Sequence, residues 1–167
     1  MCFLNEQYLF VTGSYVRDEN VCATCERYDI KMNRFANFPP MNVGRCHHSS
    51  CSFDQRYIFV FCGLVIVKTE QEEVSEQDRG MTIITEKLRW EPSASIERFD
   101  STKKFEGWST ISIPVSPLTP RRTPGVVQTS PTEILIFGGF ARNKDLRATY
   151  RFNTYTETIV KYAKVSG

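Results

Sequence analysis

The sequence predicts an all-β protein assembled from repeated antiparallel sheets. Its 167 residues are 41% hydrophobic and 13% aromatic, which is enough apolar surface for the core of a globular domain. Short runs of β-branched and aromatic residues alternate with Gly, Pro, Asp and Asn, and almost no segment follows the period of a helix. The same order of signatures occurs three times along the chain, which indicates a structural repeat.

The clearest strands are three apolar runs at residues 8–11, 57–61 and 133–137. Each run ends in a small residue followed by glycine: Thr12-Gly13, Cys62-Gly63 and Gly138-Gly139. Glycine at such a position lets the chain turn with a positive φ and lets a neighbouring backbone approach closely. We therefore expect each run to be a buried strand that ends in a sharp turn.

A second signature lies downstream of each glycine. It reads Glu-Arg-Tyr-Asp at 26–29, Glu-Arg-Phe-Asp at 97–100 and Tyr-Arg-Phe-Asn at 150–153. Another large apolar residue follows across a short turn, which gives the pairs Tyr28 and Phe35, Phe99 and Trp108, and Phe152 and Ile159. This spacing predicts adjacent antiparallel strands whose large side chains pack on one sheet face. The charged residues of the signature are predicted to be structural.

A proline-rich connection precedes the second and third units. Pro39-Pro40-Met41 is followed by Arg45 and His48, and a looser version at 114–120 is followed by Arg121 and Arg122. With this segment, the chain resembles kelch repeats, units of roughly 50 residues that each fold as a four-stranded propeller blade. The resemblance implies structural roles for the residues at the repeat positions. These are Gly13, Tyr28, Phe35, Gly63, Phe99, Trp108, Gly138, Gly139 and Phe152.

The resemblance implies a single kelch-like segment over 1–167, with blades near 7–41, 45–114 and 121–163. The second unit carries an insertion within 64–93, whose acidic middle at 70–78 is predicted to be a loop, followed by an extra strand or hairpin arm. The count is about two and a half blades, whereas propellers close with about four to eight. We therefore expect an incomplete ring that the rest of a longer chain or a partner chain completes.

Charge and composition narrow the class of partner. The 21 basic and 19 acidic residues leave a net charge of +2, so neither nucleic acid nor an anionic membrane is favoured. No apolar run approaches the roughly 20 residues of a membrane span, and the first residues do not resemble a secretory signal. We expect a cytoplasmic protein whose six cysteines are free thiols.

Metal binding is an alternative that the cysteines raise. Cys22 and Cys25 form a Cys-x-x-Cys pair, and Cys46 and Cys51 follow about 20 residues later, so four zinc ligands are available on paper. The repeat already accounts for these positions as small residues on strands. The preferred interpretation is therefore buried, inert thiols, with no metal or cofactor.

Catalysis has less support, and the chain is predicted not to be an enzyme. Its two histidines, His47 and His48, are adjacent on an expected strand and so point to opposite sheet faces. No catalytic triad can be assembled from them. His48 is interpreted as a core residue of the repeat.

The connections and the insertion are expected to emerge on one face of the blades, where propellers usually bind their ligands. The predicted partner contacts are Arg45, Glu72, Glu73, Trp90, Arg121 and Arg122. The resemblance implies a noncatalytic protein-interaction module that acts as a scaffold in a larger assembly. Two alternatives stay open: a substrate-recruiting subunit of a ubiquitin ligase, and a metal-dependent enzyme whose site is shared with the missing blades.

Overall fold

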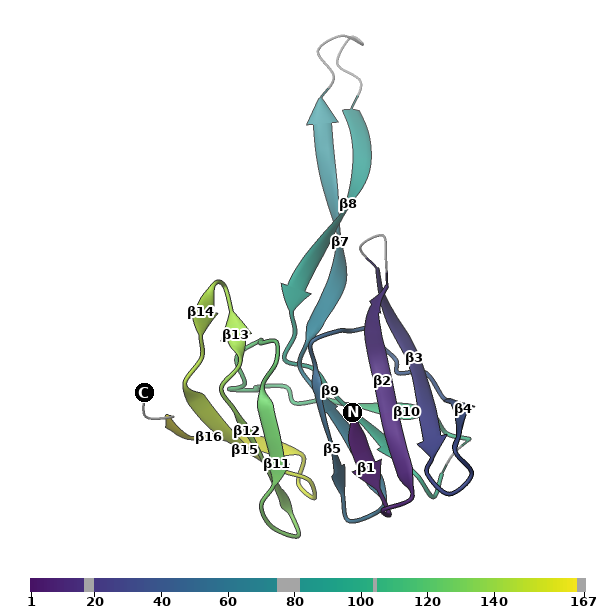
Figure 1. Cartoon of the computed structure of the whole chain (residues 1–167). Helices are drawn as coiled ribbons and strands as arrows, with labels where there is room; N and C mark the ends of the chain where they lie inside the picture. The colour runs from purple at the N-terminus through teal and green to yellow at the C-terminus, as the bar shows by residue number, and fades with distance from the viewer. Residues whose placement is uncertain (17–19, 75–81, 104, 165–167) are drawn as a thin grey trace.

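A computed structural model describes residues 1–16, 20–74, 82–103 and 105–164. These ranges form three four-stranded antiparallel sheets and two separate hairpins, without any helix (Figure 1). Accordingly, the described part of the chain offers no helix that could cross a lipid bilayer. The predicted all-β class and the four-stranded antiparallel sheets are confirmed.

The first sheet is complete within this chain and has the order β1-β2-β3-β4. Its strands are β1 (Cys2–Leu4), β2 (Tyr8–Val16), β3 (Asn20–Asp29) and β4 (Arg34–Phe38). The expected boundary near residue 7 is therefore too late, because the short strand β1 pairs with β2. The count of two and a half blades is corrected to three full sheets.

The second sheet is interrupted by the insertion, which forms a long hairpin (Figure 1). The sheet contains β5 (Ser49–Phe53), β6 (Tyr57–Phe61), β9 (Ile96–Asp100) and β10 (Trp108–Ile111), and the hairpin contains β7 (Leu64–Val74) and β8 (Thr82–Pro92). The prediction of a loop at 70–78 is wrong for residues 70–74, which belong to β7. Backbone pairing to β8 extends β7 that far despite its acidic composition, while 75–78 fall outside the described residues.

The third sheet repeats the plan with a much shorter hairpin. Its strands are β11 (Gly125–Gln128), β12 (Glu133–Phe137), β15 (Ala148–Asn153) and β16 (Thr158–Lys164). The short hairpin of β13 (Phe140–Ala141) and β14 (Lys144–Asp145) stands between β12 and β15, where the second sheet carries β7 and β8. Insertions thus enter the repeat at one fixed point.

The sheets stack face to face, with β1 beside β5 and β5 beside β11. One apolar cluster lies between the first and second sheets, where Phe38 meets Phe99 at 4.3 Å between ring centroids. A second cluster lies between the second and third sheets, where Phe59 meets Phe152 at 5.6 Å. Both faces of the second sheet are therefore covered, and each outer sheet has one covered face.

The large residues of the repeat pair across strands as predicted. Tyr28 lies opposite Phe35 and Phe99 opposite Trp108. Phe99 and Trp108 are buried, but Phe35 is 58% exposed. Phe35 packs against Tyr28 at 4.9 Å between ring centroids, and it is exposed because no described sheet packs on that face of the first sheet.

The glycines of the three signatures are offset by one position between the units. Gly13 lies at a bulge inside β2, so the expectation that the first run ends in a turn at its glycine is wrong. The backbone of Gly13 (φ +54°) matches those of Cys62 (+63°) and Gly138 (+61°), whereas Gly63 and Gly139 adopt φ near +100° and +91°. A Cβ on Gly63 would lie 2.7 Å from the carbonyl oxygen of Cys46. The second glycine of the pair is thus required by the close approach of the preceding connection.

A pair of substitutions at one repeat position tests the stacking. Trp108→Ala should lower the free energy of unfolding by about 3–5 kcal/mol, because it leaves a cavity between two sheets. Phe35→Ala occupies the same position in the first sheet and should cost about 1 kcal/mol or less. Urea denaturation followed by circular dichroism measures both, and equal losses would contradict the stacking order.

Candidate functional site

The connections between sheets lie at the bases of the two hairpins, which puts these loops on one face of the stack (Figure 1). The backbone of Cys46 bridges Leu64 at the start of β7, and the backbone of Arg122 bridges Phe140 at the start of β13. The expectation that the connections and the insertion share a face is confirmed by these backbone hydrogen bonds.

Two of the predicted contact residues, Arg45 and Arg121, are not surface residues. Both side chains are fully buried, so the prediction that they contact a partner is corrected. Arg45 Nη1 donates to the carbonyl oxygen of Cys62 at 2.9 Å, and Arg121 Nη1 donates to that of Gly138 at 2.7 Å. The backbone carbonyls at these turns have lost their strand partners, and each guanidinium satisfies them.

A buried carboxylate completes the site around Arg45. Arg45 Nη2 lies 2.5 Å from Glu97 Oε1, and both side chains are inaccessible to solvent. Glu97 also accepts hydrogen bonds from the backbone N–H groups of Asn42 at 2.6 Å and Val43 at 3.2 Å. The ion pair therefore fastens the first connection onto the second sheet, and a buried pair is tolerated only with such additional partners.

The third sheet varies this arrangement. Tyr150 stands where the second sheet has Glu97, and the Arg121 guanidinium lies over its ring at 4.8 Å. Arg121 Nη2 has no hydrogen-bond partner among the described residues. Each buried arginine precedes the residue whose carbonyl oxygen it binds by 17 residues. This equal spacing is a repeat signal in the sequence that could have indicated a shared structural role.

Two other predicted contact residues, Trp90 and Arg122, lie near the surface. Trp90 is half-buried and packs against Tyr15 at 5.6 Å between ring centroids. Arg122 is half-buried, with its guanidinium 4.6 Å over the ring of Phe140. Glu72 and Glu73 belong to β7, but their side chains lie outside the described residues.

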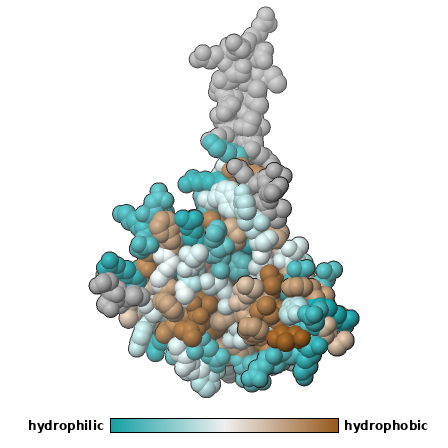
Figure 2. Space-filling model, in the orientation of Figure 1, coloured by the Kyte–Doolittle hydropathy of each residue, from teal (hydrophilic) through white to brown (hydrophobic). Residues whose placement is uncertain are grey.

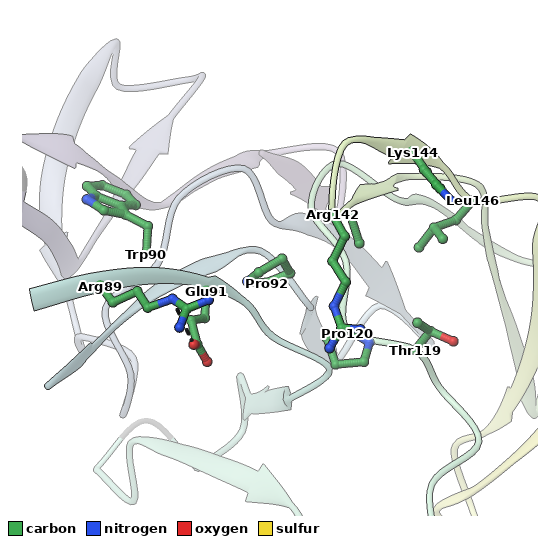
Figure 3. A pocket seen from close by; sticks show the side chains of 10 residues that line it. Arg89, Trp90, Glu91, Pro92, Thr119, Pro120, Arg142, Lys144 and Leu146 are labelled. Carbon is green, nitrogen blue, oxygen red and sulfur yellow. Dashed lines mark ion pairs between the residues drawn. The ribbon is translucent and has the colours of Figure 1, made fainter. Parts of the chain in front are cut away.

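A groove of about 470 Å³ lies between β8, the second connection and the β13–β14 hairpin (Figure 3). Its apolar lining includes Trp90, Pro92, Pro120, Ala141 and Leu146. Its charged lining is Arg89, Glu91, Arg142 and Lys144. Trp90 is thus the one predicted contact residue that lines this groove, which three separate segments of the chain form together.

The charge of the groove is predominantly positive. Arg89 Nε lies 3.3 Å from Glu91 Oε1, so these two charges offset one another. Arg142 and Lys144 are exposed on the short hairpin, and neither forms an ion pair with a carboxylate of the described residues. Sequence reasoning missed both residues, because their hairpin is short and matches no repeat signature.

The cysteines do not gather into a metal site within the described chain. All six are free thiols, and no three or more His, Cys, Asp or Glu residues come together there as potential ligands. Burial raises the pKa of Cys25 to about 11 and that of Cys51 and Cys62 to about 12, which keeps these sulfurs protonated. The arrangement gives the zinc alternative no support.

His48 lies where the first connection meets the first sheet. Its Nε2 shares a hydrogen bond of 2.8 Å with Thr12 Oγ1, and burial lowers its pKa to about 4. The side chain is therefore neutral near pH 7. This agrees with its interpretation as a packed residue of the repeat.

Comparison with known proteins supports the fold alone. No family model matches the sequence, and no curated protein matches it. A solved structure titled "Structure of YjhT" superimposes on 99% of this chain with a TM-score of 0.68 and 12% sequence identity. This chain spans 51% of that structure's length, so the likeness extends to about half of a longer chain.

The buried ion pair gives a matched test within the repeat. Glu97→Ala should lower the free energy of unfolding by about 3–5 kcal/mol, because it leaves Arg45 buried without its counter-charge. Glu26 is the carboxylate at the same position of the first sheet, and its side chain is exposed. Glu26→Ala should therefore change the free energy of unfolding by about 0.5 kcal/mol or less. Denaturant titration at pH 7 measures both, and a neutral Glu97→Ala would contradict the role of the pair.

Proposed function

We propose that the protein is a kelch-like propeller segment that acts as a noncatalytic protein-interaction module within a larger assembly. The three stacked four-stranded sheets and the likeness to half of a longer solved structure support the architectural part of this proposal. The groove beside β8 supports the binding part. A concave apolar surface with a few charged groups on a rigid sheet scaffold is the usual form of a recognition site.

The groove is the main support for this proposal, because its lining residues indicate the chemistry of the partner. An indole ring and two prolines offer apolar contact area, and Arg142 and Lys144 place positive charge at one side (Figure 3). The complementary ligand is a protein segment with one apolar or aromatic side chain and neighbouring carboxylates. Arg residues in addition form bidentate hydrogen bonds with carboxylates.

Part of the groove is held in place before any ligand arrives. Arg121 Nε donates to the carbonyl oxygen of Thr119 at 2.9 Å, and Thr119 Oγ1 lies 3.0 Å from the Tyr150 hydroxyl. These contacts fix the connection that supplies Pro120 to the lining. A preformed wall reduces the entropy lost on binding.

Charge reversal in the groove tests this proposal. Tagged wild-type protein and an Arg142→Glu/Lys144→Glu variant are used to capture partners from cells, and each captured protein is then purified and titrated by calorimetry. The double variant should bind an acidic partner at least about tenfold more weakly, because attraction becomes repulsion. A Lys31→Glu/Arg34→Glu variant, altered at the exposed turn after β3 and at the first residue of β4, is the matched control. Equal affinities of the double variant and wild type, with unchanged circular dichroism, would refute the groove as the binding site.

A further inference from the structure

The long hairpin leaves one edge of β8 without a neighbouring strand. Within the described chain, β8 forms a ladder with β7 alone. The lower part of β8 lies on the side of the hairpin that faces β13 and β14 (Figure 1). The other strand, β7, begins at Leu64, whose backbone bonds to Cys46 of the first connection. At the base of the hairpin, the open edge is therefore that of β8.

The hydrogen bonds at this base show which backbone groups of β8 point outward. The N–H and C=O of Leu64 both bond to Cys46, so they point away from β8. Leu64 lies opposite Pro92, and the direction of the backbone groups alternates along an antiparallel ladder. Trp90 and Leu88, two and four residues before Pro92, therefore direct their N–H and C=O groups away from β7. These groups form no backbone hydrogen bond within the described chain.

The groove described above runs along this free edge. Four consecutive residues of β8 line it: Arg89, Trp90, Glu91 and Pro92. Successive side chains of a strand point to opposite faces, so a groove on one face would be lined by every second residue. Figure 3 shows Trp90 on one side of the β8 ribbon and Arg89 and Glu91 on the other. The groove therefore lies beside the strand edge, where the free N–H and C=O groups are.

The wall opposite β8 supplies positive charge. Arg142 and Lys144 of the short hairpin line it and are exposed. Figure 2 shows hydrophilic side chains on this hairpin, at the left of the body of the molecule. Pro120 and Leu146 add apolar surface to the groove. A ligand that lies against the β8 edge thus has cationic groups on its other side.

We infer that an acidic segment of the partner protein binds in an extended conformation and adds a third strand to the long hairpin, pairing with β8 at Leu88 and Trp90. This inference rests on the proposed function, because it specifies how the partner segment is held in the same groove. Main-chain hydrogen bonds to a free strand edge supply affinity, and alternate side chains supply specificity. The added strand lies about 4.8 Å from β8, and its carboxylates are directed toward Arg142 and Lys144.

Pro92 determines where this pairing ends. It is the next residue after Trp90 whose backbone points outward, and proline has no N–H to donate. The edge therefore offers both a donor and an acceptor at Leu88 and Trp90, and an acceptor alone at Pro92. Proline at such a position also prevents further pairing along an edge.

A proline substitution tests the pairing without disturbing the hairpin. Leu88→Pro removes an outward N–H and leaves the bonds to β7 in place, since proline is tolerated at an edge position whose N–H faces solvent. Leu88→Ala is the matched control, because it shortens a 48% exposed side chain and keeps the N–H. Circular dichroism of both variants should match that of the wild type.

The probe is a blocked, fluorescein-labelled peptide of seven residues, in which four glutamates alternate with valine, tyrosine and valine. Fluorescence polarisation should show that it binds the wild-type chain with a Kd below about 1 mM. Leu88→Pro should weaken binding at least about tenfold, because a donor is lost and the proline ring obstructs the added strand. Leu88→Ala should weaken it by about twofold or less.

Amide hydrogen exchange of the wild-type chain, followed by NMR, is a second readout that needs no variant. The N–H groups of Leu88 and Trp90 should exchange at least about tenfold more slowly with the peptide than without it, because the added strand accepts hydrogen bonds from them. Those of Arg89 and Glu91, which already face β7, should change less. Unchanged exchange at Leu88 and Trp90 in the complex would show that side chains alone hold the peptide.

Three further results would overturn the inference. The first is a peptide that does not bind below about 1 mM, and the second is equal affinity for Leu88→Pro and Leu88→Ala. The third is a concentration-dependent dimer of the free chain that Leu88→Pro abolishes, which would assign the edge to a second copy of this protein.

The captured partner separates this inference from the proposed function. If the Arg142→Glu/Lys144→Glu variant binds that partner more weakly while Leu88→Pro binds it as the wild type does, strand pairing is refuted and the proposed function stands. If charge reversal has no effect, the groove itself is refuted as the binding site.

Discussion

A buried arginine at the start of each of the second and third sheets organises the molecule. Arg45 donates hydrogen bonds to Glu97 and to the carbonyl oxygens of Val43, Cys62 and Ser95, all with its side chain inaccessible to solvent. These acceptors belong to the connection, to the turn after β6 and to the approach to β9. A single guanidinium thus joins three segments that the sheet hydrogen bonds leave separate, and its multiple planar donors suit this role better than a lysine would.

The apolar faces explain why the sheets stack. Ile58 on one face of β6 belongs to the cluster with the first sheet, and Phe59 on the other face belongs to the cluster with the third. A strand whose successive side chains all enter a core requires a neighbour on both sides. The first and third sheets carry the same alternation, but each has one face with no neighbour in the described chain. The open faces therefore follow from the repeat and need no separate explanation.

The sequence predicted the repeated strands well, but it did not predict how the sheets that they form pack on one another. The apolar runs ending in glycine placed β2, β6 and β12, and the aromatic pairs placed their partner strands. The short strand β1 was missed, because three residues are too few to show a periodicity. Phe35 occupies the same repeat position as Trp108, but its exposure depends on a neighbouring sheet that local sequence cannot reveal.

The candidate site was less predictable for a related reason. Charged residues in connections are usually solvated, so Arg45 and Arg121 were expected at the surface. Both are buried instead, because their guanidinium groups donate hydrogen bonds to backbone carbonyl oxygens at the turns that follow β6 and β12. The groove combines residues of β8, the second connection and the β13–β14 hairpin, of which sequence reasoning identified only Trp90. Contact among segments so far apart is set by the stacking of sheets.

Native-state hydrogen exchange of the isolated chain tests the stacking most directly. The amides of β6 and β9, whose sheet is covered on both faces, should exchange with the highest free energy of opening, and those of β4 and β16, in the outer strands of sheets with one open face, with the lowest. Protection of β4 equal to or greater than that of β6 and β9 would contradict the arrangement.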